Sequence, residues 1–248
     1  MIMTKTSVRI GMALAGLFVA ASGVRADSLV LTLGNPQSGV GGEFLAIPND
    51  GPAMGLSFLY TPAARGTQAN SFETFCIQYN EEFYPGGTYN YQISTTSIMP
   101  IVPVNLGTAY LYNLFATGTL PGYTYTSPSQ AADLQNTIWN LQGTGPGASV
   151  IADPGTYDAL LIAKFGSLAN AKLATIGIYS AASYGIYALN LGTTADGNGG
   201  TWPNQDQLIY TGGGSAFGSS IFVPDGGSSL VLLGSALGGL ALLKRKLA

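Results

Sequence analysis

The chain contains a single cysteine, Cys76, and a glutamine, Gln135, that could react with it to form an internal thioester. A cysteine thiol can attack a glutamine carboxamide and expel ammonia, and a nucleophilic amine can then open the thioester to give a stable amide. Histidine is absent from all 248 residues. A fold that holds the two groups together can nevertheless supply much of the barrier reduction through proximity. Cys76 and Gln135 are therefore the candidate reactive pair.

Gln135 is a candidate because it falls on the apolar side of a predicted helix. Ser127-Pro128-Ser129-Gln130 has the pattern of a capping box with proline at the first helical position, and Gly143 ends the helix. At about 100° per residue, Gln135 lies within the apolar arc of this helix. A buried carboxamide without a partner costs about 1–3 kcal/mol. We therefore expect Gln135 to engage either the Cys76 sulfur or a backbone group.

Cys76 lies in a predicted strand, Phe72–Tyr79, on the face opposite Phe75 and Ile77. An unpaired cysteine in an oxidising compartment risks oxidation or pairing with another chain. A thioester would protect it. The alternative is that Cys76 serves as a small buried apolar residue.

The residues around this pair resemble a known family. Phe75-Cys76-Ile77 resembles the aromatic–Cys–aliphatic motif of bacterial surface thioester domains, and the segment 134–139 resembles their aliphatic–Gln–x–x–aliphatic–Trp motif. The second motif is carried by Leu134, Gln135, Ile138 and Trp139. The resemblance implies that Cys76 and Gln135 are the thioester partners and that the domain captures amines on a target surface. The 59-residue separation of the pair implies a reduced helical part.

The remaining pattern predicts an α+β fold, a β-sandwich or barrel with a central helical insertion. Strands are expected at 28–33, 43–47, 56–61, 72–79, 88–93, 184–191, 207–211 and 220–223, with 81–87 as a hairpin loop joining its flanking strands. Helical segments are expected within 105–175, with breaks at Gly118 and Gly166. The loop 193–204 contains Asp196–Gly200, which we interpret as a solvated turn because Gln207 stands where a calcium loop needs glutamate.

The amino-acid composition excludes several classes of function. The lack of histidine excludes Ser-His-Asp and Cys-His catalysis, and one cysteine excludes an intramolecular disulfide. Residues 27–223 carry three basic and eleven acidic side chains, a net charge of −8 that disfavours nucleic-acid binding. Glu81-Glu82 could suggest a glycosidase pair, but adjacent loop residues point apart. We expect neither enzymatic activity nor a cofactor or metal.

The N-terminal segment, residues 1–26, has the pattern of a secretory signal peptide. Lys5 and Arg9 precede an uncharged stretch, 10–21, and Val24-Arg25-Ala26 places small residues at −3 and −1. We expect cleavage before Asp27 and export of the domain 27–222.

The C-terminal segment, residues 223–248, resembles the PEP-CTERM class of sorting tails in its VPD-Ser/Gly-Gly form. The motif is Val223-Pro224-Asp225-Gly226-Gly227, and an uncharged stretch, 226–243, is just long enough to span a bilayer before Lys244-Arg245-Lys246. The resemblance implies recognition by an exosortase-type membrane protease, a transient membrane anchor, and a Gram-negative-type envelope with an exopolysaccharide context.

The sequence thus predicts an exported cell-surface or exopolysaccharide-matrix protein, an adhesin-like module for surface attachment. Its partners would be the exosortase and either a cell-surface polysaccharide or an amine-bearing target. Three alternatives for the body stay open: a thioester-forming binding module, a non-reactive structural protein of the biofilm matrix, and, least favoured by the residues, a secreted hydrolase.

Overall fold

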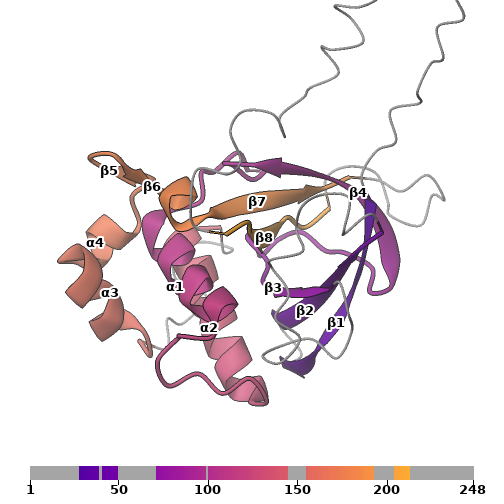
Figure 1. Cartoon of the computed structure of the whole chain (residues 1–248), viewed down its shortest axis with the longest axis horizontal. Helices are drawn as coiled ribbons and strands as arrows, with labels where there is room; N and C mark the ends of the chain where they lie inside the picture. The colour runs from indigo at the N-terminus through magenta and orange to yellow at the C-terminus, as the bar shows by residue number, and fades with distance from the viewer. Residues whose placement is uncertain are drawn as a thin grey trace, which may run out of the picture.

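The computed structural model describes residues 28–38, 41–49, 71–98, 100–144, 155–192 and 204–212 (Figure 1). The signal peptide, the sorting tail with its expected span at 226–243, the expected strands 56–61 and 220–223, and the Asp196–Gly200 turn lie outside these residues. Within the described ranges, no helix is long and apolar enough to cross a membrane.

A six-stranded antiparallel sheet is the larger of the two sheets in the described residues. Its strands are β1 (Ser28–Ser38), β2 (Gly41–Pro48), β3 (Phe72–Thr74), β4 (Gly87–Ser94), β7 (Ile186–Leu191) and β8 (Gln207–Tyr210), in the order β3-β2-β1-β4-β7-β8. A short hairpin, β5 (Thr175–Ile176) and β6 (Tyr179–Ser180), stands apart from it.

The two edges of this sheet meet, which makes it a nearly closed barrel. Beyond β3, the chain crosses to β8: the Ile77 N–H donates to the Asp206 carbonyl at 2.8 Å, and the Leu208 N–H donates to the Phe75 carbonyl at 3.0 Å. Cys76 therefore stands opposite Gln207 in an antiparallel bridge. The thiol-bearing residue lies at the closure of the barrel, where neighbouring chains are far apart in sequence.

The helices follow β4 and precede β7, and Figure 1 shows them gathered beside the barrel. They are α1 (Leu106–Thr117), α2 (Pro128–Gln142), α3 (Asp158–Phe165) and α4 (Leu168–Ala171), with the 3-10 helix η2 (Ala181–Tyr184) before β7. The expected central helical insertion and barrel-like sheet are both confirmed.

The helix boundaries agree with the sequence signals. Ser127 caps α2 by accepting the N–H of Gln130, and Pro128 occupies the first turn. The reciprocal half of the expected capping box is missing, because the Gln130 side chain instead bonds backbone groups of the preceding loop, at Gly122 and Thr124. Gly118, Gly143 and Gly166 adopt left-handed conformations that end α1, α2 and α3.

Two apolar clusters lie on opposite faces of the barrel wall. Phe75, Ile77 and Leu208 belong to the cluster that packs under the helices, together with Phe115 of α1. Cys76, Trp139 and Ile209 belong to the second cluster, which we call the barrel core, together with side chains of β1, β2, β4 and β7. The alternation expected for 75–77 is therefore confirmed: Cys76 faces away from its two apolar neighbours.

One expected feature of the sheet is wrong. The segment 81–87 was expected to be a hairpin loop joining two paired strands, but β3 and β4 do not pair, because the β1–β2 hairpin lies between them. β4 pairs with β1 at Leu29–Tyr89, while β3 pairs with β2 at Phe44–Thr74. The regular strand expected over 72–79 is also shorter, since it changes partner after Thr74.

Candidate functional site

The candidate site consists of Cys76, Gln135 and Gln207, all fully buried at the barrel closure. Cys76 is 1% exposed, and both glutamines are 0% exposed. They come from three segments: the crossing after β3, the middle of α2, and the first residue of β8.

The Gln135 carboxamide is hydrogen-bonded to the backbone of Cys76 at both of its ends. The Cys76 N–H donates to Gln135 Oε1 at 2.9 Å, and Gln135 Nε2 donates to the Cys76 carbonyl oxygen at 2.8 Å. The structure thus brings Cys76 and Gln135 into direct contact, 59 residues apart in the chain. The partner expected for the buried amide is a backbone group of the very residue that carries the thiol.

Strand geometry explains why the backbone N–H and carbonyl of Cys76 are available to Gln135. The N–H and carbonyl of one strand residue point to the same side, and successive residues alternate. Because Phe75 and Ile77 bond to β8, the polar backbone groups of Cys76 point the other way. The ladder between β2 and β3 ends at Phe44–Thr74, so the Gln135 carboxamide continues the hydrogen bonding beside Cys76.

Further contacts hold the C-terminal end of α2, one to the residue that caps α1 and two to the segment that contains Cys76. Gln142 Oε1 accepts the N–H of Asn105 at 2.9 Å, and Thr144 Oγ1 donates to the Ile77 carbonyl at 2.6 Å. Trp139 lies one helical turn after Gln135 on the same face, and its ring meets Tyr79 edge-on at 4.9 Å. The neighbouring residues Leu134 and Ile138 are also fully buried, in the cluster under the helices.

The thiol itself contacts a different glutamine. Gln207 Nε2 donates to Cys76 Sγ at 3.3 Å and to the Gln205 carbonyl at 3.1 Å. Burial raises the pKa of the Cys76 thiol well above its ordinary value, and the hydrogen bond from Gln207 opposes that rise. The resting sulfur is therefore a protonated thiol, protected from oxidants by its surroundings.

Gln207 was not among the residues expected at the site. The sequence showed only a polar run, 204–207, leading into an apolar strand. Whether a polar residue of that strand faces Cys76 depends on a strand pairing between residues 131 positions apart in the chain. Local sequence patterns cannot predict such a pairing.

A second polar cluster borders the site through Asp206. This buried carboxylate accepts hydrogen bonds from the Gln78 side chain, the Ile98 N–H and the Leu191 N–H, at 2.7, 2.7 and 3.2 Å. Burial raises the pKa of Asp206 to about 6, and burial together with the Asp206 charge raises that of Glu81 to about 7. Glu81 is half-buried, whereas the adjacent Glu82 is exposed.

No group of three or more His, Cys, Asp or Glu side chains that could hold a metal ion occurs within the described ranges. One buried carboxylate oxygen, Glu43 Oε1, instead accepts a hydrogen bond from the Tyr123 hydroxyl.

Comparison with known proteins addresses the C-terminal tail. Residues 223–247 match the VPDSG-CTERM motif. This motif is a PEP-CTERM-type sorting signal, and it confirms the sorting tail expected from Val223–Gly227 and the basic end. It implies processing by an exosortase, a membrane enzyme, and export toward the cell surface. No curated protein and no solved structure matches the chain, so the thioester-domain resemblance rests on its residues alone.

Proposed function

We propose that the chain is an exported surface or extracellular-matrix module, not an enzyme, whose Cys76 and Gln135 form an internal thioester that captures amines on a target surface. The observation that carries the proposal is the pair of hydrogen bonds between the Gln135 carboxamide and the Cys76 backbone. The VPDSG-CTERM motif supports the cellular setting, in which an exposed module would meet either an amine-bearing surface or the producer's own polysaccharide.

The two hydrogen bonds suit the chemistry of thioester formation. The Cys76 N–H donates to the oxygen that becomes negatively charged when sulfur attacks, which is the arrangement of an oxyanion hole. The carbon–nitrogen bond of the amide breaks as the carbon–sulfur bond forms, and the thiol proton leaves with the nitrogen as ammonia. The Cys76 carbonyl, which accepts from Gln135 Nε2, orients this leaving group.

The attack also requires a side-chain rotation. The Gln135 carboxamide lies along the strand edge, whereas a strand side chain stands roughly perpendicular to the hydrogen-bonding direction. The plane of the carboxamide must therefore tilt to bring its carbon toward Sγ while Oε1 stays within reach of the Cys76 N–H. Because both residues are buried and the end of α2 is held by Gln142 and, just beyond the helix, by Thr144, this rotation is the main freedom left to the pair.

A second candidate function, a non-reactive structural protein of the matrix, is favoured by one observation. Both ends of the Gln135 carboxamide are satisfied without any covalent bond, and the thiol is shielded and protonated. In that case Gln135 serves only to complete the barrel edge, and binding to exopolysaccharide rather than amine capture would be the relevant property.

Mass spectrometry of the exported, processed protein separates these candidates. With a thioester, the protein is lighter by one ammonia than its sequence requires, and methylamine adds its own mass at Gln135. Cys76→Ala and Gln135→Ala should each abolish methylamine uptake, while Gln130→Ala, which removes a glutamine of α2 that bonds only the preceding loop, should not. A wild-type protein of full mass with one titratable thiol would exclude the thioester and leave the structural role.

A further inference from the structure

The Gln207 carboxamide is oriented unambiguously at the thiol. Its Nε2 donates both to Cys76 Sγ and to the Gln205 carbonyl. If the oxygen and nitrogen of the carboxamide were exchanged, Oε1 would face the Gln205 carbonyl oxygen, and two hydrogen-bond acceptors would lie against each other. The sulfur is therefore an acceptor, and a hydrogen-bond donor points at the atom that gains negative charge whenever a carbon–sulfur bond breaks.

The other end of the same carboxamide has no partner within the part of the chain that the structure describes. Among these residues, Gln207 Oε1 is buried without a hydrogen bond, and Gln207 is 0% exposed. An unpaired buried acceptor carries a desolvation penalty. Because Oε1 and Nε2 share one carbon atom, this acceptor lies beside the sulfur, where it can take the N–H of a small molecule that reaches the reacting carbon.

We propose that Gln207 is the amine-binding and sulfur-stabilising residue of the site: its Oε1 accepts an N–H of an incoming primary amine while its Nε2 donates to the departing sulfur. This inference rests on the proposed thioester. In the step it assists, the amine nitrogen bonds to the Gln135 carbonyl carbon, the carbon–sulfur bond breaks, and one amine proton passes to sulfur to restore the thiol.

The arrangement also defines the class of ligand. A primary amine or ammonia retains an N–H for Gln207 Oε1 while its lone pair attacks, whereas a tertiary amine has none. Gln207 adds no charge to the buried site, so it assists without the cost of placing an ion there.

The test compares Gln207→Met with Gln205→Met. Methionine nearly preserves volume but removes both hydrogen-bonding atoms, and Gln205 is a matched control because its side chain bonds the Gln78 carbonyl rather than sulfur. The rate constant for methylamine capture should fall ten- to a hundredfold in Gln207→Met and stay within about twofold of wild type in Gln205→Met. Equal rates in both variants and wild type, or an equal loss in both, would overturn the proposal.

A second experiment tests the role of Gln207 if the wild-type thiol proves to be free. Iodoacetamide labelling of Cys76 should then be slower in Gln207→Met than in wild type, because a donor that stabilises thiolate is gone. A residue with a purely structural role predicts the opposite, faster labelling through a loosened barrel, and that result would overturn the assignment of Gln207. A full-mass wild type thus counts against the thioester alone, while the labelling rate judges Gln207.

Discussion

Gln135 takes the place of a strand residue beside Cys76. Its carboxamide makes the two hydrogen bonds, 2.9 and 2.8 Å, that a neighbouring strand would make to the Cys76 N–H and carbonyl. A helix side chain thereby completes the barrel edge after the β2–β3 ladder ends. The contact joins the helical insertion to the sheet at the residue that carries the thiol, so the same pair serves stability and, in our proposal, chemistry.

The first prediction concerns the stabilising effect of this contact. In a Cys76→Ala background, where no thioester contributes, Gln135→Leu should lower the free energy of unfolding by about 2–4 kcal/mol, because it leaves two buried backbone groups unpaired. Urea denaturation of the two chains gives the difference.

Gln130→Leu is the control for that measurement. Gln130 lies on the same helix and also bonds backbone groups with both ends of its carboxamide, but it does so in an exposed position where water can replace it. Its loss should cost less than about 1 kcal/mol. Equal costs for Gln130→Leu and Gln135→Leu would contradict the role given to the buried contact.

Local signals account for the part of the fold that the sequence predicted. Ser127, Pro128 and Gly143 fix the ends of α2 through short-range capping, and the helical period placed Gln135 on the buried face. These features depend on residues within a few positions of one another, so one sequence is enough to recognise them.

Non-local pairing accounts for the errors. Nothing between residues 72 and 94 indicates that β1 and β2 lie between β3 and β4, because the segments that separate them are earlier in the chain. The contact between Gln207 and Cys76 could not be predicted for the same reason, since the whole helical insertion lies between the two residues in the chain. The pair Cys76–Gln135 was accessible only because each residue stood out within its own element, one as the lone thiol and the other as a polar residue on an apolar face.

The second prediction is that the domain loses stability as the pH rises from about 4 to about 8. Asp206 and Glu81 have folded-state pKa values of about 6 and about 7, above their ordinary values. The unfolded chain therefore releases these protons at lower pH than the folded chain. Their contribution to stability is complete below the ordinary carboxyl range and is lost as the pH passes through the two raised values.

Glu81→Gln isolates part of this dependence. The variant should flatten the decline in the free energy of unfolding between about pH 5 and pH 8, whereas Glu82→Gln, at the exposed neighbouring position, should leave the decline unchanged. Chemical denaturation at a series of pH values measures both. A curve that rises with pH over this interval in the wild type would refute the raised pKa values.

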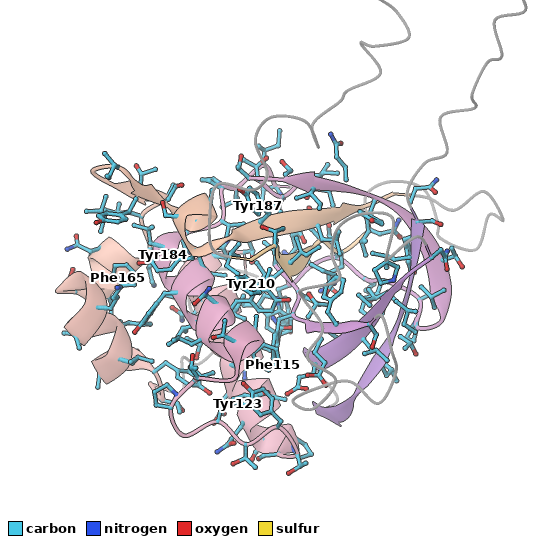
Figure 2. The ribbon with its side chains drawn as sticks, viewed as in Figure 1. Phe115, Tyr123, Phe165, Tyr184, Tyr187 and Tyr210 are labelled. Carbon is cyan, nitrogen blue, oxygen red and sulfur yellow. The ribbon has the colours of Figure 1, made fainter. Side chains whose placement is uncertain are left out.

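The third prediction concerns the buried hydroxyl of Tyr123, which donates to Glu43 Oε1. Burial and the Glu43 carboxylate both raise the pKa of Tyr123, so the hydroxyl stays protonated and remains a donor. The loop before α2 is thereby linked to β2, and Figure 2 shows Tyr123 beside Phe115 of α1, with ring centroids 5.3 Å apart. Tyr123→Phe should lower the free energy of unfolding by about 1.5–3 kcal/mol, because the bond is to a carboxyl group.

Tyr125 provides the comparison for Tyr123. Its hydroxyl donates to a neutral acceptor, the Phe115 carbonyl, at 2.8 Å in a partly buried position. Tyr125→Phe should therefore cost only about 0.5–1.5 kcal/mol. Thermal or urea denaturation of both variants supplies the ranking, and a larger loss for Tyr125→Phe would show that the Glu43 contact is not the stronger one.

The last prediction separates the chemistry of Cys76 from its packing. A serine hydroxyl can accept from Gln207 Nε2 and donate to the unpartnered Gln207 Oε1, so Cys76→Ser should keep the hydrogen bonding of the buried site intact. Cys76→Ala removes the acceptor and leaves a small void, and it should lower the free energy of unfolding by about 1–2 kcal/mol relative to Cys76→Ser. Neither variant can form a thioester, so urea denaturation compares them on equal terms and intact mass verifies that both carry their full sequence mass. If serine proves as destabilising as alanine, the Gln207 carboxamide does not reach the position-76 side chain, and its role beside the sulfur falls with it.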